Sequence, residues 1–293
     1  MPIYEIESAT AGAPLTEAAV QSYLHAIRRV LLVGAPNSWK TSSLWTWADT
    51  TDPEEYVHII SLPGEKGYSS IPQHPQVRAY RMSLDDPDNE VALTKAFTEV
   101  VALINVILDG KRGRSGTIIL DGLHKLYAEV IYPMVWKEAG GGAKEAGRAY
   151  GAAHTKFREI LNRCQRAKRF VATVWDKDKR EDPDNQRSQL QTWSALPGDM
   201  ARAVTGEFSC VFYAEPGRHM GGGKFSQGTW QTRPTTDIPT PSMKIPLQLA
   251  STAQEVIPTK IAQDWMAFER QYELMLRGQK PTADALKPKV NAA

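Results

Sequence analysis

Residues 34–41, with the sequence GAPNSWKT, place a lysine and a threonine after a glycine at the spacing of a phosphate-binding loop. In the pattern G-x-x-x-x-G-K-[ST], backbone N–H groups surround a phosphate, the lysine reaches the terminal phosphates and the threonine hydroxyl binds Mg²⁺. Gly34, Lys40 and Thr41 fit this pattern, but Trp39 takes the place of the second glycine. A positive φ at that position is easy for glycine and strained for a bulky side chain. The residues expected to contact a bound phosphate ligand are Gly34, Pro36, Asn37, Ser38, Trp39, Lys40, Thr41 and Ser42.

Two acidic residues follow other strand-like segments and could complete this chemistry. Asp121 ends the apolar run 117–121, where it could hold Mg²⁺ through water, although an aspartate at such a position is also a common helix N-cap. Glu65 lies in the turn 62–67, where its carboxylate could polarise an attacking water near a terminal phosphate. The Pro-Gly-Glu-Lys-Gly composition of this segment is equally typical of an ordinary solvated turn. Both interpretations of each acid stay open at this point.

The elements around these residues alternate between strands and helices. Strands are expected at 30–33, 56–61, 77–82, 117–121 and 170–175. Helices are expected at 18–27 with Thr16 as N-cap, at 42–48, at 91–107 after a cap at Asp88 or Asn89, at 123–137 with a break or kink near Pro133, and at 144–168. This alternation predicts an α/β fold with a mainly parallel sheet flanked by helices on both faces. A hairpin of 208–213 with 229–233 around the glycine-rich loop 217–228 would add an antiparallel edge.

The remaining segments are polar or rich in turn-forming residues. We expect 176–191 to form a mobile surface loop, because it is polar and charged throughout. The Pro- and Thr-rich segment 234–258 predicts an extended arm, followed by an amphipathic helix at 261–277 and a disordered end at 278–293. We therefore divide the chain into an α/β domain at 1–233 and, at 234–293, an arm with its helix and tail.

The order of these features resembles the RecA-like branch of P-loop ATPases. In that branch the acid that activates water follows a different strand from the Mg²⁺-binding aspartate, and a small residue follows that aspartate, as Gly122 follows Asp121 here. The resemblance narrows to the single-domain RecA-like ATPases of bacteriophages, including those associated with recombination and single-strand annealing, and covers residues 26–245. It rests on the N-terminal P-loop, the Gly-Glu-Lys-Gly turn, the Ile-Leu-Asp run before an apolar helix, the strand 171–175 entering a charged loop, and the Pro- and Thr-rich end with Lys244.

The resemblance implies a RecA-like P-loop nucleotide-binding domain that binds ATP with Mg²⁺ and hydrolyses the ATP. It implies catalytic roles for Lys40, Glu65 and Asp121, and places the metal at Thr41 and Asp121. It also implies action on single-stranded DNA in phage recombination, repair or replication. RecA-like enzymes usually hold ATP between subunits, so a homo-oligomer is expected. Contributions in trans would come from Arg218, Lys224 or Lys244.

Contact with DNA would need a local basic surface, because 35 lysines and arginines against 33 aspartates and glutamates leave a formal net charge of only +2. Basic side chains on a flexible backbone can follow phosphates without reading bases. The candidates for this contact are Lys177, Lys179, Arg180, Arg218 and Lys224. A further basic cluster at 163–169 has a simpler explanation, since the macrodipole favours basic residues at the end of a helix.

Several departures from the family pattern bear on hydrolysis. Trp39 and Asn37 stand where such loops often carry glycine, and Trp175 or Asp176 stands where these proteins carry a polar sensor residue. Lys244 also lacks the arginine that often follows nearby. The main alternative is therefore a non-hydrolysing P-loop scaffold that uses residues 234–293 to bind a partner. A small-molecule kinase is disfavoured, because no lid segment with paired arginines is evident.

Cysteine content and hydropathy give the expected location. The two cysteines, Cys164 and Cys210, supply neither a disulfide framework nor a metal-ligand pair. No segment reads as a run of ~20 apolar residues, so a membrane partner is not expected. These features favour a reducing cytoplasm, which would be that of the bacterial host if the chain is of phage origin.

Overall fold

A ten-stranded sheet forms the centre of the computed structural model, which describes residues 15–49, 51–65, 67–180, 190–196, 200–221, 224–239, 241–243, 245, 253 and 257–292. Its main path runs β12-β10-β7-β1-β5-β4-β2-β3, while β11 pairs with β7 and β6 pairs with β5. The strands are β1 (Arg29–Gly34), β2 (Glu55–Ser61), β3 (Val77–Arg81), β4 (Arg114–Asp121), β5 (Arg169–Arg180), β6 (Leu190–Ser194), β7 (Cys210–Glu215), β10 (Thr229–Gln231), β11 (Ser242–Met243) and β12 (Lys260–Ala262).

The central strands of this sheet are parallel and its end is antiparallel. Strands β7, β1, β5, β4, β2 and β3 pair in parallel, each with its neighbour. Strand β10 pairs antiparallel with β7, and β12 pairs antiparallel with β10. The predicted α/β architecture, with a mainly parallel sheet and an antiparallel edge, is therefore confirmed.

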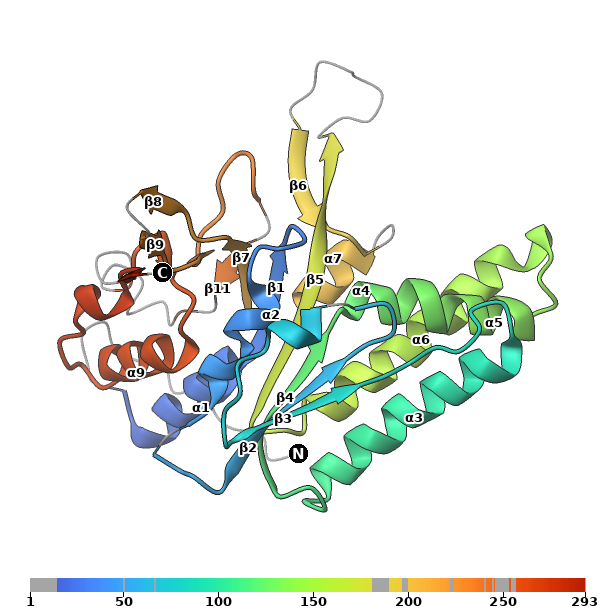
Figure 1. Ribbon diagram of the computed structural model, residues 1–293, viewed down its shortest axis with the longest axis horizontal. Helices are drawn as coiled ribbons and strands as arrows, with labels where there is room; N and C mark the ends of the chain where they lie inside the picture. The colour runs from blue at the N-terminus through green and yellow to red at the C-terminus, as the bar shows by residue number, and fades with distance from the viewer. Residues whose placement is uncertain are drawn as a thin grey trace.

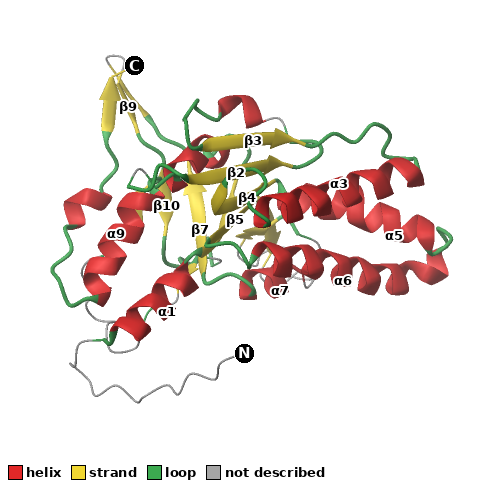
Figure 2. Ribbon diagram, turned by 90° about the horizontal axis from the view of Figure 1, so that it is seen from below, coloured by secondary structure: helices red, strands yellow, loops and turns green. Residues whose placement is uncertain are grey.

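Helices cover both faces of the sheet (Figures 1 and 2). They are α1 (Glu17–Ile27), α2 (Lys40–Ser43), α3 (Glu90–Leu108), α4 (Leu123–Lys125), α5 (Tyr132–Glu138), α6 (Ala146–Cys164), α7 (Met200–Gly206) and α9 (Trp265–Leu276). Helices α3, α5, α6 and α7 pack on one face, and α1 and α9 pack on the other. Because successive side chains of a strand alternate, Leu31 and Val33 enter the first core while Val30 and Leu32 enter the second.

Short helical segments and caps refine the predicted boundaries. Thr16 caps α1 by accepting a bond from Ala19 N (3.3 Å), and Asn89 rather than Asp88 caps α3. The helix expected at 42–48 is the short α2 followed by the 3₁₀ helix η1 (Leu44–Trp47). Pro133 does not end its helix. A π-helix, η3 (Leu126–Ile131), leads directly into α5, so the hydrogen bonding changes from π-helical to α-helical immediately before the residue that has no N–H to donate.

The prediction of a mobile loop at 176–191 is wrong for the part that the structure describes. Strand β5 continues to Arg180 and pairs with β6 as a hairpin that projects from the sheet in Figure 1. The segment alternates charged residues of both signs, so it lacks the apolar pattern by which strands are recognised in a sequence. Residues 181–189 lie outside the described part of the chain.

The C-terminal segment joins the core of the preceding domain. Helix α9 begins at Trp265, whose ring stacks on Trp47 with centroids 5.3 Å apart, and Trp47 also contacts Trp230 at 5.2 Å. These three indoles are fully buried. The division of the chain at residue 233 stays a prediction, but the predicted amphipathic helix uses its apolar side inside this molecule.

Ordered elements follow α9, where disorder was predicted. They are the 3₁₀ helix η6 (Ala283–Leu286) and β13 (Val290–Ala292). Strand β13 pairs with β9 (Lys224–Ser226), which pairs with β8 (His219–Gly221), so these three strands form a second small sheet. Backbone pairing with a distant strand stabilises a segment whose own sequence is polar, which is why composition gave the wrong expectation here.

Within the described residues, α3 is the one helix long and apolar enough to cross a membrane. Its side chains Leu93, Ala96, Val100, Ile104 and Ile107 are buried against the sheet and the neighbouring helices. A helix that packs on a sheet meets the same criteria of length and composition as a membrane span. The hydropathy of α3 is therefore weak evidence for a membrane.

Candidate functional site

The predicted site residues lie at the carboxyl ends of neighbouring parallel strands. Gly34 ends β1, Asp121 ends β4 and Glu65 follows β2, with β5 between β1 and β4. Ligands of open parallel sheets bind at this edge. Leu62 N donates to Asp121 O (3.0 Å), so the turn that carries Glu65 begins beside Asp121. The fold therefore brings the loop 34–41 and both acids to one edge of the sheet.

The loop has left-handed backbone at two residues that are not glycine. Asn37 has a φ of 66° and Trp39 has a φ of 65°, and these are the two such positions in the described part of the chain. Asparagine tolerates this region better than most residues. For Trp39 the left-handed conformation costs about 1–2 kcal/mol. The tryptophan thus adopts the kind of backbone conformation that a glycine would provide without strain.

Lys40 points back into the loop. Its Nζ donates to Gly34 O (2.7 Å), Ala35 O (2.8 Å) and Ser38 Oγ (3.0 Å), and the residue is 6% exposed. Burial lowers the pKa of Lys40 to about 8, although the carboxylates of Asp121, Asp176 and Glu65 act in the opposite direction. The ammonium group is thus held inside the loop by acceptors that an incoming phosphate can replace.

Asp121 is buried among hydroxyl donors. Its carboxylate accepts bonds from Thr41 Oγ1 (2.9 Å to Oδ2) and from Thr173 Oγ1 (2.6 Å to Oδ1). Burial raises the pKa of Asp121, and these hydroxyls and Lys40 oppose that rise. Thr173 on β5 also accepts the N–H of Gly122 (2.9 Å). Sequence reasoning did not name Thr173, although a polar residue inside the apolar run 170–175 was the available signal.

Glu65 lies directly against Gly122. A Cβ on Gly122, which has a φ of 93°, would come within 2.8 Å of Glu65 Oε1. Burial, together with the neighbouring Asp121, raises the pKa of Glu65 to about 7. Its Oε1 is buried without a hydrogen-bond partner among the described residues. The glycine after Asp121 therefore leaves room for a second carboxyl group beside the first.

Lys125 holds the turn in which Glu65 lies. Its Nζ donates to Gly64 O (2.7 Å) and lies 4.6 Å from the centroid of the Trp175 ring. The positive charge of Lys125 also opposes the rise in the pKa of Glu65. Lysine on the first turn after a strand carries no recognisable signal in the sequence, so this residue was missed.

Of the two candidates for the sensor position, Asp176 is the one whose charge acts on Lys40. The Asp176 carboxylate accepts a bond from Tyr213 OH (2.6 Å) on β7. The Trp175 ring packs instead on His124, with centroids 4.8 Å apart. Asp176 is therefore the candidate for the sensor position whose charge acts on the loop lysine, and its carboxylate accepts a bond from a tyrosine.

Residues 26–240 match the AAA domain family. The chain belongs to this family. An AAA domain of the P-loop ATPase type supports ATP binding and hydrolysis as the general activity. No curated protein matches the chain.

Two solved structures that match the chain are ATPases of bacterial type III secretion systems. One is described as a prototypical ATPase from the type III secretion system of pathogenic bacteria, with a TM-score of 0.35, 13% identity, and 64% of this chain and 52% of that chain covered. The other is the assembled ATPase EscN of enteropathogenic E. coli, with a TM-score of 0.33, 11% identity, and 66% and 45% covered. The chain thus spans about half the length of these proteins.

Two contacts reach the loop of the AAA domain from segments that sequence reasoning did not connect with it. The Trp39 ring lies against Gly217, where a Cβ would come within 2.6 Å of the indole. Gln263 Nε2 donates to Ser38 O (3.1 Å) from the connection between β12 and α9. Gln263 lies beyond the residues that match the AAA family, so no motif could indicate it.

The basic residues proposed for DNA contact lie on separate elements. Lys177 is on β5 and its Nζ donates to Leu196 O (2.7 Å), while Arg218 is exposed and follows the Gly217 that contacts Trp39. The backbones of Lys179 and Arg180 belong to the β5–β6 hairpin and that of Lys224 belongs to β9. The side chains of these three, and all of Lys244, lie outside the described part of the structure.

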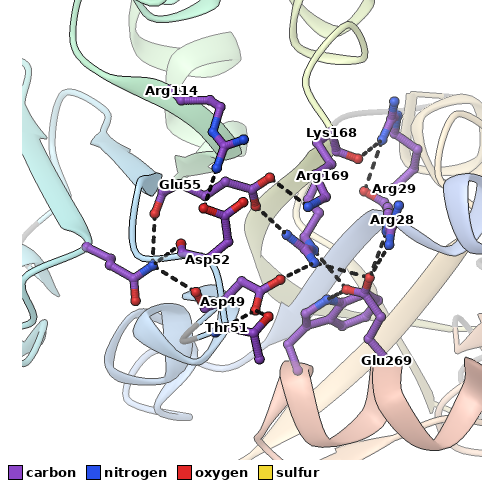
Figure 3. A network of polar contacts seen from close by, with 12 residues as sticks. Arg28, Arg29, Asp49, Thr51, Asp52, Glu55, Arg114, Lys168, Arg169 and Glu269 are labelled. Carbon is purple, nitrogen blue, oxygen red and sulfur yellow. Dashed lines mark hydrogen bonds and ion pairs between the residues drawn. The ribbon is translucent and has the colours of Figure 1, made fainter.

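Three of the four basic residues at 163–169 pair with carboxylates within the molecule. Arg169 is 2% exposed and its Nε donates to Glu269 Oε2 on α9 (2.8 Å), while Lys168 pairs with Glu55 (2.7 Å), as Figure 3 shows. Arg28 pairs with the same Glu269 (2.6 Å). This network joins α9 to the start of β5, at the end of the strand opposite to Thr173 and Asp176, and its arginines and lysine have carboxylate partners.

Proposed function

We propose that the protein binds Mg-ATP at the loop 34–41 and hydrolyses it. The observation that carries this proposal is the contact between Thr41 and Asp121, 2.9 Å apart, with Glu65 packed against the next residue, Gly122. A hydroxyl and a carboxylate beside a loop lysine are the groups that a phosphate-bound magnesium ion requires from a P-loop protein.

The residues at this site fit a magnesium ion. Thr41 Oγ1 and the Asp121 carboxylate are hard oxygen ligands, and Mg²⁺ is commonly held by one or two such groups with waters and substrate phosphates. Within the described residues, no group of three acidic, histidine or cysteine side chains could hold a metal by itself. When bound, the ion would neutralise charge on the phosphates.

Glu65 supports hydrolysis rather than binding alone. A carboxyl group whose pKa is raised to about 7 is suited to accept a proton from water near neutral pH. Its Oε1 is not committed to a donor among the described residues. Lys40 would then stabilise the charge that develops on the transferred phosphate.

We further propose that single-stranded DNA stimulates this activity and that the protein acts as a homo-oligomer in phage recombination, repair or replication. The exposed Arg218 and the projecting β5–β6 hairpin support the DNA contact. Such a contact depends on phosphates, so the stimulation should weaken as salt concentration rises. Arg218, Lys224 and Lys244 are the candidates for a contribution in trans to the site of a neighbouring subunit.

The proposal is tested by titrating the protein with Mg-ATP in a calorimeter and by measuring phosphate release with and without single-stranded DNA. Lys40→Ala should abolish binding, whereas Lys111→Ala, which removes a lysine with a 68% exposed side chain, should leave binding unchanged. Equal affinity in wild type and Lys40→Ala would refute nucleotide binding at this loop. ATP binding without phosphate release under either condition would favour the scaffold alternative.

The strained Trp39 is the observation that favours a non-hydrolysing scaffold. If this residue alone disables an otherwise complete site, Trp39→Gly should gain phosphate release that the wild type lacks. The scaffold alternative assigned partner binding to the C-terminal helix. Trp265 and Phe268 of that helix are fully buried in the core of this molecule, so a scaffold would need another docking surface.

A further inference from the structure

Gln263 connects the phosphate-binding loop to the antiparallel edge of the sheet. It is 3% exposed, and its Nε2 donates to Ser38 O (3.1 Å), Glu215 O (3.0 Å) and Thr229 O (3.2 Å). A Cβ on Gly228 would come within 2.7 Å of the same carboxamide. The side chain is therefore enclosed, and its amide group has fixed acceptors on three separate segments.

The bond to Ser38 O fixes the orientation of one peptide group in the loop. In a planar trans peptide the C=O and the following N–H point in opposite directions. Because Gln263 holds the carbonyl of Ser38 toward itself, the N–H of Trp39 points away from Gln263. The loop binds phosphates through such N–H groups, so the orientation of this peptide matters for the proposed nucleotide site.

Trp39 is the residue that most needs support of this kind. Its left-handed backbone, with a φ of 65°, is unfavourable for tryptophan, and such conformations persist where the surrounding structure determines them. Two contacts from outside the loop supply this support. Gln263 holds the preceding carbonyl, and the glycine at 217 leaves space for the indole.

We propose that Gln263 is a positioning residue that keeps Trp39 in its left-handed conformation, and so allows a loop without the second glycine to bind ATP phosphates. The inference rests on the proposed function, because ATP is the ligand whose binding it improves. It assigns a role in the nucleotide site to a residue outside the family match at 26–240. Gln263 also bridges β7 and β10, so the test must separate the loop from the sheet edge.

The variant Gln263→Met removes the donor and keeps a side chain of similar length. A matched control is Gln76→Met, because Gln76 is 5% exposed and its Nε2 likewise donates to three backbone carbonyls, those of Asp49, Asp52 and Glu55. The first measurement is amide hydrogen exchange without nucleotide. Gln263→Met should speed exchange at 37–41, and Gln76→Met should not.

The second measurement is the affinity for Mg-ATP in the wild type and in a Trp39→Gly background. The strain of a left-handed non-glycine residue corresponds to a factor of roughly 5–30 in binding. Gln263→Met should therefore weaken binding by about that factor in the wild type, and by less than about twofold when residue 39 is glycine. If Gln263 only supports the sheet edge, Gln263→Met should weaken Mg-ATP binding by the same factor in both backgrounds.

Each outcome bears on one of the two proposals. Equal losses in both backgrounds, or unchanged exchange at 37–41, would overturn the positioning role while leaving ATP binding intact. A wild type without affinity for Mg-ATP would refute the proposed function, and the exchange measurement would still decide whether Gln263 orders the loop. If Gln263→Met does not fold, Gly228→Ala offers a second variant, because its new Cβ displaces the carboxamide without removing it.

Discussion

Replacing Trp39 by glycine and by alanine separates backbone strain in the loop from packing of the side chain. Both variants lose the indole and its contact with Gly217. The difference between them therefore depends on the backbone at residue 39 alone. At a φ of 65°, alanine bears a cost of about 1–2 kcal/mol that glycine does not. Glycine loses about 0.5–1 kcal/mol more in conformational entropy on folding. Trp39→Gly should accordingly be the more stable variant by up to about 1.5 kcal/mol, with about 0.75 kcal/mol at the middle of the two ranges.

The assay is urea unfolding followed by circular dichroism, with both variants analysed at a common slope. Ala102, exposed on α3, is the matched control, because Ala102→Gly should lose about 1 kcal/mol in a right-handed helix. The preference between glycine and alanine should therefore reverse between the two sites. If alanine is the more stable of the two at residue 39, as is expected at residue 102, residue 39 is not left-handed, and the argument for Gln263 fails with it.

Three further predictions concern the acids and the buried ion pairs. The kcat/KM for ATP hydrolysis should rise as the pH increases through about 7, because Glu65, whose pKa is raised to about 7, loses its proton there. Glu65→Gln should remove this pH dependence and lower kcat/KM at least about 100-fold. Phosphate release measured across that pH range tests both expectations. Gly122→Ala should lower turnover at least about tenfold with little change in Mg-ATP affinity, because the new Cβ displaces Glu65. Unchanged turnover would show that Glu65 does not act from that position. Glu269→Gln should lower the free energy of unfolding by about 3 kcal/mol, because Arg169 stays buried without its main anion, while calorimetry of the folded variant should give wild-type Mg-ATP affinity.

The strands that carry the site could be predicted because buried parallel strands are uninterrupted apolar runs. The runs at 30–33, 56–61 and 117–121 lie within β1, β2 and β4, and the acids that follow them meet at one edge of the sheet. That juxtaposition follows from topology, since the carboxyl ends of neighbouring parallel strands lie together. Local sequence located the strands and their acids, and the resemblance to RecA-like ATPases predicted that Glu65 would lie near Asp121.

The supporting residues could not be predicted, because their contacts span long stretches of chain. Gln263 is 225 residues away from Ser38, and Gly217 is far along the chain from Trp39. Nothing in the residues around Gln263 indicates which carbonyl it will meet. The backbone conformation of Trp39 could not be predicted either. The sequence shows a tryptophan where a glycine is usual, but it does not show whether the loop keeps a glycine-like conformation at that residue.

The site therefore depends on a segment that the family match does not include. The match ends at residue 240, while the amide that orients the loop comes from Gln263 and the indole that completes the adjoining core comes from Trp265. A chain cut after residue 240 would lose both together. If such a truncated chain failed to bind ATP, the cause could equally be the exposed core around Trp47 or the altered loop. The stability of the AAA domain and the shape of its phosphate-binding loop can be separated only by substituting a single side chain. Comparing Gln263→Met with Gln76→Met is such a test.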